Sequence, residues 1–109
     1  MNKREVIRVL DEAKKVLIEK GWTQGYYAKD AQGELVGSHD GDACAFCAIG
    51  ALSRAAKGAL NRVGDEALNA VVAVTPGFNI PIYNDAPGRT KEEILALFDK
   101  AKEQVNEQG

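Results

Sequence analysis

The sequence predicts a mostly α-helical α+β fold, in which about four helices surround an apolar central helix at residues 43–56 and one short β-hairpin lies at residues 25–36. Three observations predict it. Apolar residues recur at helical spacing near both ends of the chain, the middle is apolar at almost every position, and two adjacent tyrosines precede a glycine turn. With 109 residues, of which 45% are hydrophobic, the chain has the size of one domain. We therefore expect a single globular domain over residues 1–109.

The first helix is predicted by one apolar stripe. Apolar residues recur there at steps of three or four, as on one face of a helix. They are Val6, Leu10, Ala13 and Leu17. Asn2 precedes the stripe and suits the N-cap, the residue whose side chain accepts a hydrogen bond from a free amide of the first turn. Gly21 suits the left-handed conformation in which many helices end.

A β-hairpin is predicted after this helix. Tyr26 and Tyr27 favour a strand, and the segment Asp30-Ala31-Gln32-Gly33 has aspartate and glycine at the two ends of a tight turn. The residues that follow, ELVG, would return as the second strand.

The second predicted helix is the apolar central one. Asp42 can cap it, it runs through residues 43–56, and Lys57-Gly58 would end it. Because it is apolar almost all round, we expect it to be buried. Gly50 in its middle costs about 1 kcal/mol relative to alanine. We therefore expect another backbone segment to pack closely against Gly50.

Two further helices are predicted in the second half of the chain. Asp65 can begin one that Pro76-Gly77 ends, although residues 70–74 also fit a strand, and this alternative stays open. The last helix begins at Thr90, which forms a capping-box pattern with Glu93. Its apolar stripe consists of Ile94, Leu97, Phe98, Ala101 and Val105.

The net charge and the lengths of the apolar runs argue against a nucleic-acid-binding protein and a membrane protein. The net charge is −2 at pH 7, which gives no general attraction for nucleic acid or for an acidic membrane. The longest apolar run, ACAFCAIGAL, is far shorter than the about 20 residues of a membrane-spanning helix. The N-terminus carries charges where a secretion signal would be apolar. We therefore expect a cytoplasmic protein that binds neither membranes nor nucleic acid.

The cysteines and the single histidine support a catalytic hypothesis. A thiol near a helix start can have a lowered pKa, so Cys47 could act as a nucleophile with His39 as base and Asn84 or Asp85 as the orienting group. The protein would then be a cysteine-dependent hydrolase or transferase. The alternative is that Cys44 and Cys47 are small apolar core residues.

We expect no metal and no cofactor. Cys44-x-x-Cys47 is the spacing of half a zinc site, but the chain has no second such pair, and zinc needs four ligands. His39 and Asp85 would have to complete the set. A thioredoxin-like motif usually holds proline or glycine between its cysteines, where this chain has Ala45-Phe46.

A binding site is predicted from the polar and aromatic residues outside the apolar stripes. They would line a groove for a small ligand or a peptide, or else cover the ends of the core. The residues are Trp22, Gln24, Tyr26, Tyr27, Tyr83, Asn84, Asp85 and Arg89. Arg89 precedes the last helix, whose free amides attract anions. Glu92 and Glu93 occupy that first turn and oppose an anion there. Pro87-Gly88 is explained by a type II turn.

Three segments together carry a resemblance: GWTQGYYAKDAQGELV, FCAIGALSRA and YNDAPGRTKEEILALFDKA. In this order they resemble a family of small uncharacterised proteins of bacteria and their phages, a domain of unknown function. The pattern of that family falls on Trp22, Gln24, Gly25, Cys47, Gly50, Leu52, Asn84, Asp85, Gly88, Arg89 and Thr90. It includes neither Cys44 nor His39, which weakens the metal hypothesis and the histidine-assisted one. The resemblance implies a fold and a gene context, and no reaction.

We expect a small non-catalytic binding protein, with the cysteine-dependent enzyme as the alternative. Size, the weak catalytic signals and the resemblance favour a phage or prophage accessory protein that modulates a host or defence component. Its partner would be a host protein or a small ligand. The sequence identifies neither, and it leaves the oligomeric state open.

Overall fold

The computed structural model describes residues 2–56 and 61–107. This part of the chain contains α1 (Lys3–Glu19), β1 (Ala28–Lys29), β2 (Leu35–Val36), β3 (Ala45–Phe46), α2 (Ala48–Ala55), α3 (Asn61–Val74), the 3-10 helix η1 (Pro76–Phe78), α4 (Ile80–Asp85) and α5 (Lys91–Glu107). Helices therefore dominate, with one small antiparallel sheet. The mostly α-helical α+β class predicted from the sequence is confirmed.

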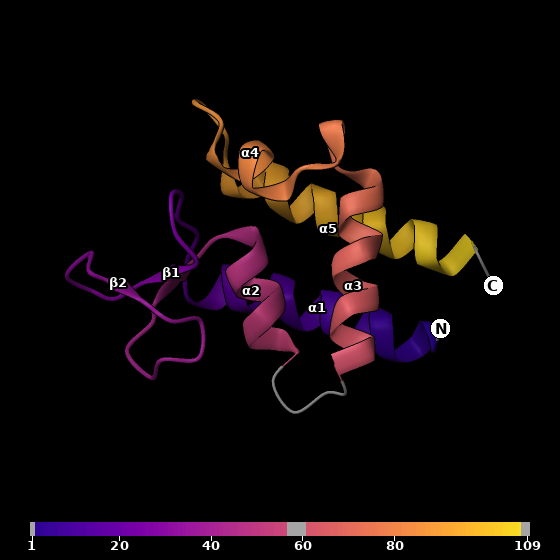
Figure 1. Cartoon of the computed structure of the whole chain (residues 1–109), viewed down its shortest axis with the longest axis horizontal. Coiled ribbons are helices and arrows are strands. Elements are labelled where there is room, and N and C mark those ends of the chain that lie inside the picture. Colours follow the sequence, from indigo (N-terminus) through magenta and orange to yellow (C-terminus); the bar gives the residue numbers. More distant parts are fainter. Residues whose placement is uncertain (1, 57–60, 108–109) are drawn as a thin grey trace.

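The helices form two crossed layers (Figure 1). α1 and α5 lie side by side, α2 and α3 run across them, and α1 packs against α2, α3 and α5. The start of α1 and the end of α5 lie at one end of the molecule, where the Lys3 Nζ donates to the Asn106 carbonyl at 3.0 Å, and the strands lie at the other. Within the described residues, no helix is long and apolar enough to cross a membrane.

The two predicted apolar stripes form much of the core. Their residues in α1 and α5 are all buried: Val6, Leu10, Ala13, Leu17, Ile94, Leu97, Phe98, Ala101 and Val105. The caps predicted for these two helices are confirmed as well. Asn2 Oδ1 accepts from the Glu5 amide (3.2 Å). Thr90 Oγ1 accepts from the Glu93 amide (3.2 Å), while Glu93 Oε1 accepts from the Thr90 amide (2.9 Å).

The sheet has the strand order β2-β1-β3, with both pairs antiparallel. The predicted hairpin is its β1–β2 half, but Tyr26 and Tyr27, expected in the first strand, precede β1. Its turn is held by Asp30, whose Oδ1 accepts from the amides of Gln32 and Glu34 at 2.9 Å each. The third strand, β3, was not predicted from the sequence. It pairs Phe46 with Ala28 in β1.

The helix expected over 43–56 is shorter than predicted, because its first part is strand β3. α2 begins at Ala48, and its N-cap is Cys47 in place of Asp42. The amides of residues 44, 46 and 47 donate to the carbonyls of Lys29, Gly21 and Tyr27, so this segment is extended. An apolar run without polar positions fits a strand and a helix alike. The end expected at Lys57-Gly58 lies outside the described residues.

The third helix is longer than predicted, and the strand alternative for residues 70–74 is wrong. α3 begins at Asn61, before the expected start at Asp65, and continues to Val74. Thr75 follows, and its Oγ1 donates to the Val71 carbonyl at 2.6 Å. Pro76 then begins η1, as the predicted stop at Pro76-Gly77 requires.

The short helix α4 was not predicted. Asn79 is its N-cap, with the side-chain oxygen accepting from the Ile82 amide at 3.0 Å, and Pro81 lies in its first turn. An Asn cap followed by proline is a helix-start signal that the sequence does contain. The helix is only six residues long, and so short an element has no apolar period to reveal it.

The close backbone packing expected at Gly50 is confirmed. A Cβ added there would lie 2.0 Å from the Tyr27 carbonyl oxygen and 2.9 Å from its carbon. The same carbonyl accepts from the Cys47 amide at 3.1 Å, so it cannot move away without losing that bond. Glycine at position 50 therefore lets α2 lie directly on the 25–27 segment.

We predict that Gly50→Ala destabilises the protein by about 2 kcal/mol or more, because the overlap with Tyr27 outweighs the helix propensity gained. Urea unfolding would measure it. Gly41→Ala is the matched control, since a Cβ at Gly41 meets nothing within 4 Å. A Gly50→Ala protein as stable as the parent would contradict the close approach.

Candidate functional site

The side chain of Asn84 connects α4 to two other segments. Asn84 is 1% exposed. Its Oδ1 accepts from the indole Nε1 of Trp22 (2.8 Å) and from the Ala48 amide (3.0 Å), which is a free amide at the start of α2. Its Nδ2 donates to the Thr23 carbonyl (3.1 Å) and to Asp85 Oδ1 (2.9 Å). A carboxamide has two donor hydrogens and two acceptor positions, so all of them are used.

The 23–25 segment completes this network from the other side. Gln24 Nε2 donates to the carbonyls of Asn84 and Ala86, at 3.0 Å each. These are carbonyls at the end of α4 that the helix itself leaves free. The Gly25 amide donates to Asp85 Oδ1 at 2.9 Å. The end of α4 is thus capped by a segment about 60 residues earlier in the chain.

Arg89 is bound within the turn that precedes α5. Its Nε donates to the Tyr83 carbonyl at 2.7 Å, and its guanidinium lies 3.7 Å from the centre of the Tyr83 ring. It also pairs with Glu93 at 3.1 Å. The pKa of Glu93 is lowered, first by the hydrogen bond from the Thr90 amide and further by the charge of Arg89. The guanidinium of this candidate binding residue is therefore engaged within the protein.

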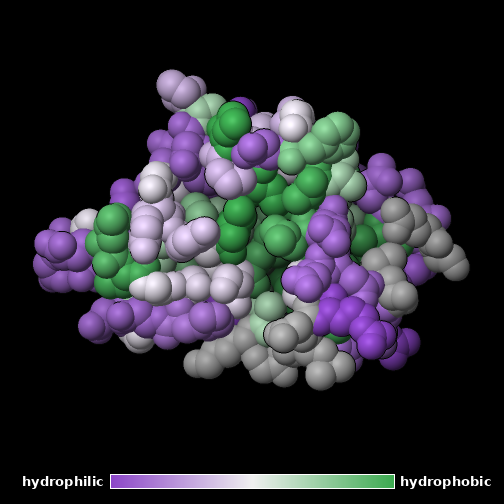
Figure 2. Space-filling view, viewed as in Figure 1, coloured by the Kyte–Doolittle hydropathy of each residue, from purple (hydrophilic) through white to green (hydrophobic). Residues whose placement is uncertain are grey.

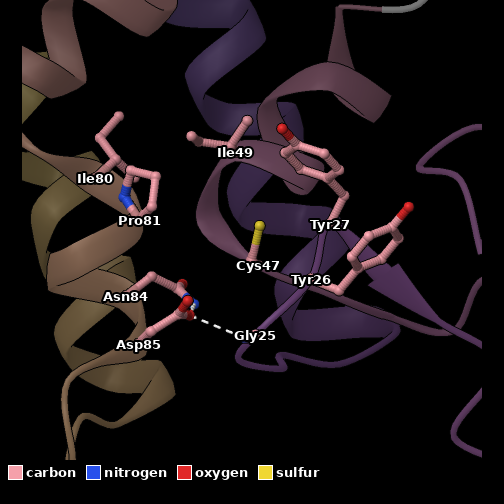
Figure 3. A pocket seen from close by; sticks show the side chains of 9 residues that line it. All are labelled: Gly25, Tyr26, Tyr27, Cys47, Ile49, Ile80, Pro81, Asn84 and Asp85. Atoms are coloured by element: carbon pink, nitrogen blue, oxygen red, sulfur yellow. Dashed lines mark hydrogen bonds between the residues drawn. The ribbon is translucent and has the colours of Figure 1, made fainter. Parts of the chain in front are cut away.

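A pocket of about 300 Å³ lies between α2, α4 and residues 25–27, and we call it the α2–α4 pocket. Its lining residues are Gly25, Tyr26, Tyr27, Cys47, Ile49, Ile80, Pro81, Asn84 and Asp85. In Figure 3, Ile80 and Pro81 face the two tyrosines across it, and the Cys47 sulfur lies between these walls. Most of the lining is apolar, with one carboxylate at the edge.

Cys47 is a buried cap as well as a lining residue. Its Sγ accepts from the Gly50 amide at 3.3 Å at the start of α2. Burial raises the pKa of this thiol above its ordinary value, the nearby Asp85 charge adds to the rise, and the hydrogen bonds from Gly50 and Ile49 oppose it. The thiol is therefore neutral at pH 7. The activation by a helix start that the sequence allowed is outweighed by desolvation.

His39, the base of the catalytic hypothesis, lies away from Cys47. His39 is exposed, and its Nε2 lies 3.3 Å from Ser53 Oγ. Neither His39 nor Cys44 lines the α2–α4 pocket. In the described part of the chain, no three His, Cys, Asp or Glu side chains form a group that could hold a metal ion. The structure brings Asn84 and Asp85 to the pocket of Cys47 without His39.

The residues predicted as a binding site fall into two groups. Tyr26, Asn84 and Asp85 line the α2–α4 pocket, and Tyr27 joins them. The others support α4 through the bonds described above: Trp22, Gln24, Tyr83 and Arg89. Sequence reasoning missed the apolar walls, Ile49, Ile80 and Pro81. The Asn79-Ile80-Pro81 helix start is the signal that could have placed two of them.

Hydrophobic surface continues beyond the pocket. Figure 2 shows it over η1 and α4 and in the hollow toward α2 and α3. Phe78 is 72% exposed and Ile82 is 70% exposed. Phe78 also has a φ of +56°, a conformation that costs a non-glycine residue roughly 1 kcal/mol or more. Large exposed apolar side chains that gather in one area mark interaction surfaces.

We predict that Asn84→Ala lowers the free energy of unfolding by about 3 kcal/mol, because it leaves the Trp22 indole, the Ala48 amide and the Thr23 carbonyl without partners. Chemical denaturation would measure the change. Asn69→Ala removes the same side chain from an exposed position of α3 and should have little effect. A loss of under about 1 kcal/mol for Asn84→Ala would show that the network is not essential.

We predict that native Cys47 reacts with iodoacetamide far more slowly than Cys44 at pH 7, and that its rate rises only above the ordinary thiol range. Only the thiolate attacks the reagent, and burial of Cys47 disfavours the thiolate. Peptide mass spectrometry of a pH series would give both rates. The two cysteines should label alike in denaturant, and rapid labelling of native Cys47 at neutral pH would contradict the prediction.

The comparisons with known proteins identify one family. No curated protein and no solved structure matches this chain. The model of one family, described as a family of unknown function, DUF6197, matches residues 1–104 and thus nearly the whole sequence. The match spans α1 to α5, including the Asn84 network and the α2–α4 pocket. The chain therefore belongs to the family of unknown function DUF6197.

Proposed function

We propose that this protein is a small non-catalytic binding protein whose ligand or partner group enters the α2–α4 pocket. One observation carries the proposal. The polar groups of Asn84, Gln24 and Arg89 are engaged within the protein, whereas the apolar walls of the pocket face open space. Apolar lining with a few fixed polar groups is the usual character of a ligand site.

Binding is better supported than catalysis. A cysteine nucleophile needs a thiolate and a nearby base, but Cys47 is a neutral buried thiol and His39 lies beside Ser53. The amide of Asn84 is saturated by bonds that hold the fold together, so it has no free group for a substrate. The enzyme alternative from the sequence gains no support from these contacts.

The exposed apolar side chains beside the pocket favour an interaction role. Phe78 and Ile82 present two large apolar groups on and next to α4. We further propose, as the resemblance implies, that the protein acts in the cytoplasm of a bacterial cell as a phage or prophage accessory protein. It would modulate a host or defence component by holding a small ligand or a group of a host protein.

We predict that a small uncharged aromatic probe, benzyl alcohol, binds in the α2–α4 pocket. Two-dimensional amide NMR of the labelled protein would follow the titration. Saturable shifts should be concentrated at residues 25–27, at the start of α2 and in α4. Ile49→Trp should abolish them, because the larger ring fills the space between the walls.

The control is Ile18→Trp, which makes the same substitution at an exposed position of α1 and should leave the titration unchanged. Circular dichroism would show that both variants keep the fold. Non-saturable or scattered shifts, or equal shifts in Ile49→Trp, would overturn the proposed binding role of this pocket.

A further inference from the structure

The α2–α4 pocket has a single charged group among the lining residues that the structure describes. This group is the Asp85 carboxylate, since the other lining residues are apolar or neutral. Asp85 Oδ1 accepts from the Gly25 amide and from Asn84 Nδ2, at 2.9 Å each. Those two bonds fix the carboxylate, and no described residue donates to Oδ2. A negative charge with one free acceptor atom therefore lies at the edge of the pocket.

No cation of the described chain neutralises this carboxylate. Among the described residues, Asp11, Asp99, Glu19 and Glu93 each have a cationic partner, whereas none is found for Asp85. Arg89, which follows closely in sequence, is directed to Tyr83 and Glu93. An occupant with a positive charge would thus meet an unneutralised acid.

Two aromatic rings lie on the same pocket. Tyr26 and Tyr27 both line it, with ring centres 5.5 Å apart and planes tilted by 55°. The face of an aromatic ring attracts a cation, and a group of rings is the recurrent means of binding alkylated ammonium groups. In Figure 3 these rings form the wall opposite Ile80 and Pro81. Those two aliphatic side chains can contact methyl groups, which a metal ion or a hydrated inorganic cation lacks.

We propose that the α2–α4 pocket binds a small free organic cation, an alkylated ammonium compound whose charge faces the Asp85 carboxylate and the tyrosine rings and whose methyl groups contact Ile80 and Pro81. The volume of about 300 Å³ is at the small end of ligand pockets, so a whole small molecule fits this description. The inference rests on the proposed function, because it names the ligand class of the same pocket.

The decisive probes are choline and its uncharged isostere 3,3-dimethylbutan-1-ol, which differ by a nitrogen cation in place of a carbon atom. Amide NMR titrations of the full chain would measure both affinities. We expect choline to bind at least about tenfold more tightly than the alcohol, with shifts at residues 25–27 and in α4. Equal affinities would overturn the cation proposal and leave the pocket as an apolar site.

Variants separate the charge from the shape of the pocket. Asp85→Asn keeps an oxygen for the Gly25 amide and removes the charge, so it should weaken choline about tenfold and leave the alcohol unchanged. Tyr26→Leu should weaken choline as well. Glu103→Gln removes the same charge from an exposed position of α5 and should change neither affinity. Unchanged choline binding in Asp85→Asn would overturn the proposal.

The benzyl alcohol titration distinguishes the two levels of failure. If benzyl alcohol binds and choline does not, the cation proposal is wrong and the binding role stands. If no probe binds, the proposed function fails together with the ligand class.

Discussion

The carboxamide of Asn84 is the interaction on which the candidate site depends. It bonds an indole, two backbone groups and a carboxylate at the meeting point of α4, the 22–25 segment and the start of α2. The Trp22 indole, the Ala48 amide and the Thr23 carbonyl would each lose their hydrogen-bond partner if the carboxamide were lost. The pocket walls come from α4, from α2 and from residues 25–27, which continue the 22–25 segment, so this side chain helps to set their spacing.

Several residues that seemed suited to ligand binding prove to have a structural reason to be polar. Trp22 and Gln24 bond to α4, and Arg89 joins the end of α4 to the start of α5. Together with Gly50, which admits the Tyr27 carbonyl, these residues form the contacts that hold α4 and α2 in place. What is left for a ligand is the apolar space that these contacts enclose.

Most of the fold could be predicted from the sequence because its causes are local. The α1 and α5 stripes, the Asn2 cap and the Thr90–Glu93 box each depend on residues a few positions apart. β3 could not be predicted, because the extended state of Ala45-Phe46 is imposed by distant partners, Gly21 and β1. For the site, the chemistry of Asn84 and Asp85 drew attention to the correct segment. The apolar walls did not stand out, since an isoleucine in a pocket and one in the core look alike in a sequence.

The bond from Trp22 to Asn84 also provides an optical reporter. Trp22 is the single tryptophan of the chain, and its indole donates to a residue 62 positions away. Its fluorescence therefore depends on whether α4 is docked, while the circular dichroism of the chain is dominated by the long helices α1, α3 and α5. A local opening of α4 would change the emission before the helical signal falls. The two spectra together separate loss of the pocket from loss of the fold, without any added label.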